Sequence, residues 1–197
     1  MTEPPSIPQT CSIAFKEWAG VCDALGSGRQ SLILRKGGVS EGEAGFAPEH
    51  RAFWLYPTFV HEAEQGLRTP VPTGLVETPG MVIIESLAVV EWLTRIERID
   101  TLATLGVFHD WTESTLLKRF QYRTPGLWAL VVRVYRRREP WPVAITPAQL
   151  GCRTWVPLEA AVPAGADELI PVLDDAEALA RRTAIQSALA DQVDRTG

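Results

Sequence analysis

The chain has 197 residues, which is enough for one domain with a full hydrophobic core. Its mean hydropathy is zero and 46% of its residues are hydrophobic, a composition typical of soluble globular proteins. No apolar run approaches the roughly 20 residues of a membrane helix, and residues 1–8 lack the features of a signal peptide. The three cysteines have no CxxC spacing, so neither a disulfide framework nor a structural zinc site is indicated. We expect a cytoplasmic protein with no membrane partner.

The net charge of -5 is unevenly distributed along the chain. Residues 1–158 hold 16 Lys and Arg against 16 Asp and Glu, whereas the last 39 residues hold three against eight. Residues 118–153 contain eight cations, seven of them arginine, and only one acid, Glu139. Arginine suits forked contacts with phosphate or carboxylate groups. This segment is either a solvated surface of strands and turns or a face that binds anions or nucleic acid.

Residues 13–25 predict a helix, because Phe15, Trp18, Cys22 and Leu25 recur at helical spacing. Two short strands are expected next, at residues 31–36 and at residues 52–56, and Pro57 ends the second. The segment between them, residues 37–48, contains four glycines and predicts a loop. Thr58 is expected to cap a short helix through Gln65.

Residues 67–80 are rich in Pro and Gly and predict a linker or a long surface excursion. Residues 81–97 are apolar and rich in Val and Ile, which favours a strand, with a helix over residues 86–98 as the alternative. One helical turn is expected at residues 100–105, followed by a helix through Phe120 that Thr112 caps.

Residues 127–136 give the clearest strand pattern of the chain. Pro140, Pro142 and Pro147 predict an irregular segment after it, and residues 153–158 predict a last strand. We divide the chain into a loose lead-in (1–12), one globular α+β domain (13–160), a linker (161–173) and a C-terminal helix (174–197). The helix is Ala-rich with a thin apolar stripe, and we expect it to dock on the domain or on a partner.

Several segments of the chain, in their order, resemble the bacterial family called domain of unknown function 1802. Together they cover about residues 13–160, and the family has no established activity. The matching segments are Phe15–Ala19, Leu32–Gly38, Phe53–Thr58, His61, His109–Thr112, Arg133–Tyr135 and Gly151–Val156.

The order of elements also resembles the layout of PUA-like and ASCH domains, small β-barrels associated with RNA or nucleotide-type ligands. Their motif is Gly-x-Lys-x-x-Glu-x-Arg, and here Gly28 and Arg35 match it, while Gln30 replaces the Lys and Ile33 the Glu. The resemblance implies an α+β fold: a mixed, curved sheet or a small PUA-like β-barrel of about six strands, with the N-terminal helix packed on it. The C-terminal helix would be separate.

Each of the three histidines has a carboxylate neighbour in the sequence: Glu49 beside His50, Glu62 beside His61, and Asp110 beside His109. Imidazole and carboxylate are ordinary metal ligands and also form acid–base pairs. Neighbours on a strand point to opposite faces, however, so unconnected surface or capping histidines are the simpler interpretation. The candidate catalytic residues are His50, His61, Glu62 and His109. No phosphate loop, dinucleotide fingerprint or serine-hydrolase motif occurs, and we expect no cofactor and assign no metal ligand.

The chain contains seven tryptophans, several of them within a few residues of Arg or His. Aromatic faces interleaved with arginine suit single-stranded nucleic acid, because bases stack on the rings while cations contact the phosphates. The same pattern also fits a Trp-rich core with arginine stems packed over it.

The leading hypothesis is a module that binds RNA or another single-stranded nucleic acid. One alternative is a small hydrolase or metal-dependent nuclease that uses the histidines and their carboxylates. Another is a protein-interaction module that forms a homodimer through the C-terminal helix. In the leading hypothesis the phosphate contacts are Arg29, Arg35, Lys36, Arg119, Arg133 and Arg153, and the base-stacking residues are Tyr56, Trp111 and Trp155.

Overall fold

The computed structural model describes residues 6–36, 48–59, 66–151 and 153–190. Seven strands lie within these ranges: β1 (Thr10–Trp18), β2 (Leu32–Arg35), β3 (Ala52–Thr58), β4 (Met81–Ile96), β5 (Leu127–Ala144), β6 (Trp155–Pro163) and β7 (Leu169–Pro171). The same ranges contain the helices α1 (Ala19–Gly26), α2 (Thr101–Thr104), α3 (Glu113–Gln121) and α4 (Asp175–Ala190), and the 3₁₀ helix η3 (Pro147–Gln149).

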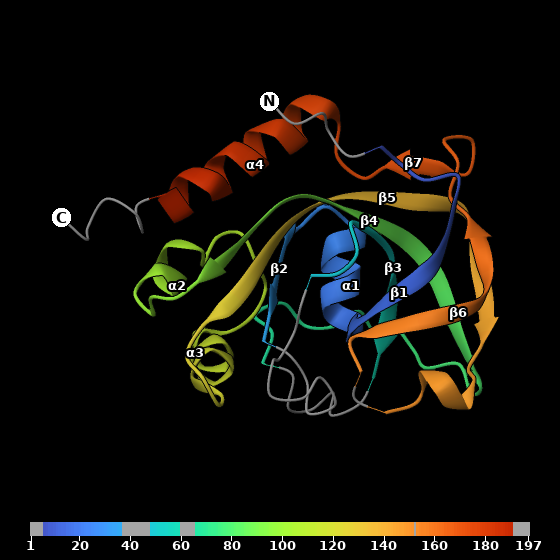
Figure 1. Cartoon of the computed structure of the whole chain (residues 1–197), viewed down its shortest axis with the longest axis horizontal. Helices are drawn as coiled ribbons and strands as arrows, with labels where there is room; N and C mark the ends of the chain where they lie inside the picture. The colour runs from blue at the N-terminus through green and yellow to red at the C-terminus, as the bar shows by residue number, and fades with distance from the viewer. Residues whose placement is uncertain (1–5, 37–47, 60–65, 152, 191–197) are drawn as a thin grey trace.

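All seven strands belong to one mixed sheet, in the order β2-β5-β4-β3-β1-β6, with β7 paired to β5. β1 and β3 are parallel, and the other pairs are antiparallel. Figure 1 shows the sheet curving around α1. The α+β class and the mixed, curved sheet are thus confirmed. The sheet does not close into a barrel, since no backbone ladder joins β2 to β6 within the described residues.

The helix predicted over residues 13–25 is wrong in its first half, where the chain forms β1 and turns into α1 only at Ala19. β1 lies between β3 and β6 and is covered on both faces, so Ala14 joins one hydrophobic cluster and Phe15 the other. A strand buried on both faces has no clean alternation of apolar and polar residues. The apolar positions across the junction of strand and helix imitate the helical period.

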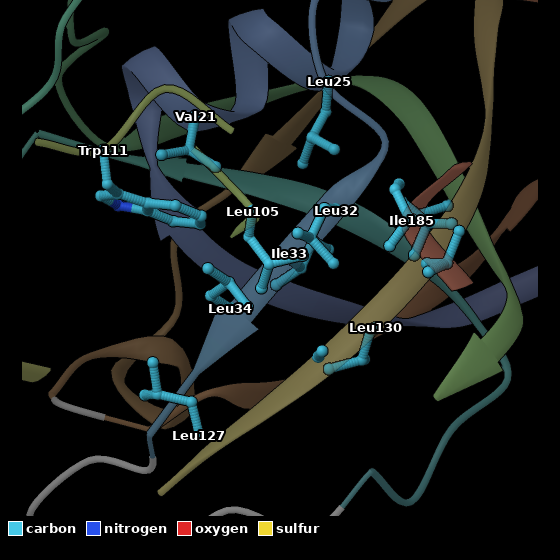
Figure 2. Close-up of a cluster of buried hydrophobic side chains, with 14 of the residues drawn as sticks. Val21, Leu25, Leu32, Ile33, Leu34, Leu105, Trp111, Leu127, Leu130 and Ile185 are labelled. Atoms are coloured by element: carbon cyan, nitrogen blue, oxygen red, sulfur yellow. The ribbon is translucent and has the colours of Figure 1, made fainter. Parts of the chain in front are cut away.

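The sheet buries side chains on both faces. The larger cluster fills the inside of the curve, where β2 and β5 meet α1 and the helical segments (Figure 2). The smaller cluster lies on the other face of the sheet. Successive residues of β3 alternate between the two, with Phe53 and Leu55 in the larger cluster and Trp54 and Tyr56 in the smaller. Burial on both faces explains why β3 and β4 appear in the sequence as continuous apolar runs.

Most of the other predicted elements are confirmed. β2 and β4 occupy the expected segments, whereas β3 continues past Pro57, which was expected to end it, to Thr58. β4 pairs with both β3 and β5, so the alternative helix over residues 86–98 does not form. α2 supplies the predicted helical turn. Thr112 caps α3, because its side-chain oxygen accepts a hydrogen bond of 3.4 Å from the Thr115 N–H. Thr58 is the last residue of β3, and the short helix expected after it lies mostly outside the described residues.

β5 continues beyond residue 136, where we predicted an irregular segment because of the prolines. Its pairing with β4 shifts register there, from Arg136 opposite Ser86 to Trp141 opposite Ile84. Pro140 lies inside this shift and therefore needs no ladder hydrogen bond. β7 pairs with β5 only as far as Arg137. Pro140 and Pro142 therefore lie where the other edge of β5 has no strand partner among the described residues.

The C-terminal segments pack on the sheet. Residues 161–173, predicted as a linker, contain the end of β6 and all of β7. α4 buries Ala178, Ile185 and Leu189 against α2 and β5.

Among the described helices, none has both the length and the apolar character needed to cross a membrane.

Candidate functional site

A groove of about 790 Å³ opens beside the junction of β1 and α1. Its walls come from the ends of β1 and β3, residues 74–78, the first residues of β4, and residues 149–151 and 153. Chain segments distant in sequence thus converge on one opening, as is usual for ligand sites.

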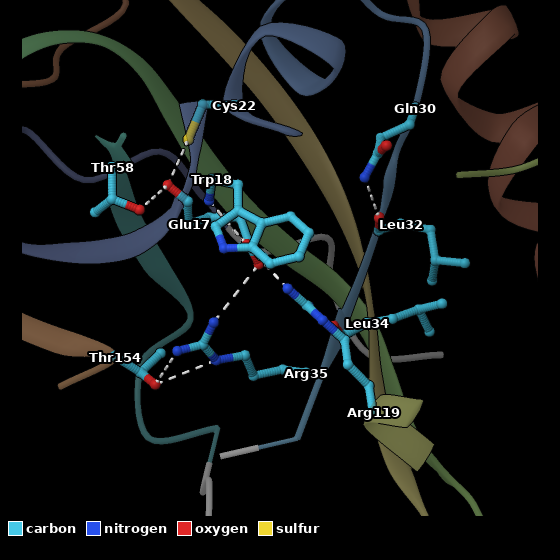
Figure 3. A network of polar contacts seen from close by, with 10 residues as sticks. All are labelled: Glu17, Trp18, Cys22, Gln30, Leu32, Leu34, Arg35, Thr58, Arg119 and Thr154. Atoms are coloured by element: carbon cyan, nitrogen blue, oxygen red, sulfur yellow. Dashed lines mark hydrogen bonds and ion pairs between the residues drawn. The ribbon is translucent and has the colours of Figure 1, made fainter. Parts of the chain in front are cut away.

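Glu17 lies at the base of this groove and is only 1% exposed. Its Oε1 accepts a hydrogen bond of 2.9 Å from the Trp18 N–H. Its Oε2 has no hydrogen-bond partner among the described residues. Arg35 NH1 lies 3.7 Å from Oε2, and Arg119 NH2 lies 4.0 Å from Oε1 (Figure 3). One carboxylate between two guanidinium groups leaves this cluster with a net positive charge.

The two arginines reach Glu17 from different elements. Arg35 ends β2, and its Nε and NH2 both donate to the Thr154 hydroxyl, at 3.2 and 2.6 Å. Arg119 belongs to α3, donates to the Leu34 carbonyl and lies 4.2 Å above the Trp18 ring. Burial lowers the pKa of Arg119, but a guanidinium starts so high that it keeps its charge near neutral pH.

Lys16 and Tyr56 form the next part of the groove wall. Lys16 Nζ donates to the carbonyls of Gln149 and Gly151, and it lies 5.5 Å from the centre of the Tyr56 ring. Burial, and to a lesser degree Glu77, raises the pKa of Tyr56, so its phenol stays protonated. Lys16 thereby ties β1 to the segment that closes one end of the groove.

Cys22 lines the groove from α1. Burial, and then Glu17 and Asp23, raise the pKa of its thiol well above the ordinary value. The thiol is therefore protonated and is a poor nucleophile.

Exposed apolar side chains stand around the groove. Val76 is 69% exposed, Leu150 is 62% exposed and Met81 is 37% exposed, and all three line it. Such side chains are normally scattered singly over a protein surface, so their gathering at one opening favours a ligand with apolar faces.

Two further arginines line the groove. Arg136 lies 3.5 Å from Glu85 and is balanced by it. Arg153 is exposed and forms no hydrogen bond or ion pair with any residue that the structure describes. Arg153 is therefore available to an anionic ligand.

The structure brings three of the predicted binding residues into the groove: Arg35, Tyr56 and Arg153. Arg119 lies next to them, behind the Trp18 ring. Trp155 lies half-buried and packs edge-on against Phe15 and Phe53.

The remaining predicted cations are engaged elsewhere. Arg29 forms an ion pair of 2.8 Å with Asp23. Lys36 donates to three backbone carbonyls, among them those of Phe120 and Gly126. Arg133 lies beneath the start of α4 and pairs with Asp175 at 2.8 Å.

His50 and His109, the two candidate catalytic histidines that the structure describes, do not share a site. His50 packs on Trp155, whereas His109 is buried against Trp111. Burial, then the charge of Arg68, lowers the pKa of His109 to about 4. Trp111 is fully buried, so protein covers both faces of its ring. His61 and Glu62 lie outside the described residues.

No group of three or more His, Cys, Asp or Glu side chains placed to hold a metal ion occurs in the described ranges.

Sequence reasoning missed Lys16, Glu17, Trp18 and Thr154. The predicted helix placed Lys16 and Glu17 on faces away from its apolar stripe, whereas the strand turns Glu17 inward. A strand interpretation of residues 10–18 would have found it. Ile33, at the acidic position of the motif quoted above, is fully buried, and the carboxylate beside Arg35 is that of Glu17 instead.

A sequence model of the family described as domain of unknown function (DUF1802) matches residues 14–184. The fold is similar to crystal structures of an ASCH protein from Zymomonas mobilis, with 14% identity, a TM-score of 0.40, and coverage of 85% of this chain and 92% of that chain. A tyrosine-to-phenylalanine variant of that protein gives 13% identity and a TM-score of 0.43, with coverage of 79% and 91%. A serine-to-alanine variant gives 15% identity and a TM-score of 0.41, with coverage of 82% of this chain and 93% of that chain. A search of curated proteins found no match.

Proposed function

Because the chain belongs to the family described as domain of unknown function 1802, which names no activity, we propose from the site itself that it binds single-stranded nucleic acid, RNA in particular. The observation that carries this proposal is the combination, in one groove, of an arginine with no partner among the described residues, a net positive cluster and exposed apolar side chains. The nucleotide would lie with its base inside the groove.

Phosphate groups would bind at the cationic end of the groove. Arg153 supplies an exposed guanidinium with no partner among the described residues, and Arg35 supplies part of the positive charge at the base. Arginine binds phosphate oxygens through two parallel N–H groups, which makes it a common phosphate ligand.

The base would lie between Tyr56 and Trp18 on one side and the apolar rim on the other. A groove of about 790 Å³ lies in the size range of small-ligand sites. Apolar and aromatic walls bind any base through its flat faces, and a duplex hides those faces in its stack. Single strands are therefore the expected ligands.

This proposal uses fewer residues than the sequence predicted. Arg29, Lys36 and Arg133 already have protein partners, and Trp111 has no free face. The proposal therefore assigns them to the support of the fold. The buried face of α4 is likewise used within the chain, so it gives no reason to propose a dimer.

Binding of a fluorescently labelled ten-nucleotide RNA, measured by anisotropy across a salt series, tests the proposal. Affinity should fall as salt rises, and Arg153→Ala should lower the slope of log K against log salt by about 0.7, the value for one phosphate contact on a single strand. Arg98→Ala is the matched control, because Arg98 is exposed, pairs with Asp100 and does not line the groove. Salt-independent binding, or equal effects of the two substitutions, would contradict the proposal.

A further inference from the structure

We propose that Glu17 and Arg35 together recognise the edge of one unpaired base, and that they prefer a base with an amino group beside a ring-nitrogen acceptor. Cytosine and adenine share this chemistry. The inference rests on the proposed binding of nucleic acid and specifies which feature of the ligand the groove recognises.

The first observation is the incomplete hydrogen bonding of Glu17. Its side chain is fully buried, yet Oε2 accepts no hydrogen bond from any described residue. Burying a carboxylate oxygen without a donor is unfavourable, because the bonds to water are lost and nothing replaces them. An N–H group of a ligand would donate the hydrogen bond that Oε2 lacks.

The second observation concerns Arg35. Its Nε and NH2 donate to the Thr154 hydroxyl, whereas NH1 has only the contact of 3.7 Å with Glu17, which is longer than a hydrogen bond. NH1 is therefore a free donor as far as the described residues show. The groove thus has an acceptor and a donor side by side at its base.

An acceptor beside a donor matches an amino group beside an unprotonated ring nitrogen. Cytosine and adenine present this pair on the edge that they use in base pairing. Uracil and hypoxanthine present a carbonyl beside an N–H, so the order is reversed. In the position of cytosine or adenine they would place a carbonyl against the carboxylate of Glu17 and an N–H against the guanidinium of Arg35, so each base would have to shift or turn over to bond both groups.

Access to Oε2 requires a small movement of Arg35. The Arg35 side chain is 17% exposed, and its guanidinium is held by the Thr154 hydroxyl, by the ion pair with Glu17 and by the Phe15 ring, which lies 5.4 Å away. In this proposal the guanidinium turns away from Oε2, which breaks the 3.7 Å contact and gives the ligand access to the carboxylate. Arg119, which is held by Trp18 and by the Leu34 carbonyl, keeps the charge of Glu17 compensated meanwhile.

The experiment compares ligands in matched pairs by titration calorimetry: the 5′-monophosphates of cytidine and uridine, and those of adenosine and inosine. The members of a pair have the same sugar and phosphate and differ only at the edge of the base. The wild-type protein should bind the amino-bearing member of a pair about tenfold more tightly. Comparing the two amino-bearing ligands shows whether cytosine or adenine fits better.

Glu17→Gln is the informative variant, because it keeps the size of the side chain but replaces an acceptor-only group with an amide that both donates and accepts. The preference within each pair should fall to about twofold or less, while Arg98→Ala retains it. Thermal denaturation establishes that the variant is folded. If it is not, the ligand pairs measured on wild-type protein still decide the question.

Equal affinities within both pairs, in a protein that binds single-stranded RNA with the expected salt dependence, would overturn the inference and leave the proposed function standing. A preference that survives Glu17→Gln unchanged would also overturn it. Absence of any RNA binding in the salt series would overturn both proposals, and so the two failures are distinguishable.

Discussion

Arg35 NH1 lies 3.7 Å from Glu17 Oε2, although β2 and β1 are separated by three strands in the order of the sheet. The curvature of the sheet brings the two strands together across its open side. Side chains rather than backbone hydrogen bonds therefore connect them: Arg35 contacts Glu17 on β1 and Thr154 just before β6. The groove lies at this connection, so the same contacts serve the fold and the site.

Arg35→Ala should destabilise the protein by about 3 kcal/mol, because it removes one partner of a buried ion pair and the hydrogen bonds to Thr154. Urea denaturation gives the free energy of unfolding. Arg98→Ala, which removes an exposed pair, should leave that free energy close to the wild-type value. Similar values for the two variants would show that the connection contributes little to stability.

His109 should make stability depend on pH. Its pKa falls from 6.5 to about 4 on folding, so the folded state binds fewer protons than the unfolded state between these values. The free energy of unfolding therefore carries its full contribution from neutral His109 above pH 6.5. This contribution declines as the pH falls to about 4, by about 3 kcal/mol in total. Urea denaturation at several pH values measures it, and His109→Gln should flatten the dependence in this window.

His50→Gln serves as the control for His109, because His50 lies against Trp155 in another part of the domain. Its pH dependence should match that of the wild-type protein. A His109→Gln protein with the same decline between pH 6.5 and 4 would assign the effect to other groups.

Gly28→Ala should lower the free energy of unfolding by about 1–2 kcal/mol or more. Gly28 has a φ of 74°, and a Cβ there would lie 2.8 Å from Leu173 Cδ2, so the substitution adds both backbone strain and a steric clash. Gly74→Ala is the matched control, since a Cβ at Gly74 meets nothing within 4 Å. Thermal denaturation of the two variants compares them, and equal melting temperatures would contradict the expectation.

α4 should behave as part of the core. Ile185 is 0% exposed, and Ile185→Ala should lower the free energy of unfolding by about 2–5 kcal/mol. Leu179 lies on the same helix but is 54% exposed, so Leu179→Ala should have little effect. If urea denaturation gives the same result for both, α4 does not stabilise the domain.

The sequence predicts elements well where the pattern of one segment is sufficient. The strands β2 to β5 and the helix capped by Thr112 are examples, because each shows a local period or a local end signal. β1 could not be recognised in this way, because it continues directly into α1 and the apolar positions across that junction imitate the helical period. The base of the groove was missed for the same reason, as Glu17 belongs to β1.

Prediction of the site depended on contacts between distant segments. Arg35, Tyr56 and Arg153 were expected to bind a ligand, and they line the groove. Trp111 and Arg133 were chosen by residue type alone, and the fold buries one and pairs the other with Asp175. The sequence around a tryptophan or an arginine does not reveal which partner the chain will bring to it.

The pairing of β4 with β5 shifts register twice, and the shift between Ile84 and Ser86 separates the part beside the groove from the rest. Residues 86–96 pair with residues 127–136 over the hydrophobic core, whereas residues 81–84 pair with residues 141–144 beside the groove. The hydrogen-bond ladder is interrupted between the parts, so the outer one can open locally while the inner one stays closed. Amide protons of the groove wall will therefore exchange with solvent faster than those of the inner ladder, and the wall can adjust to a ligand without any unfolding of the core.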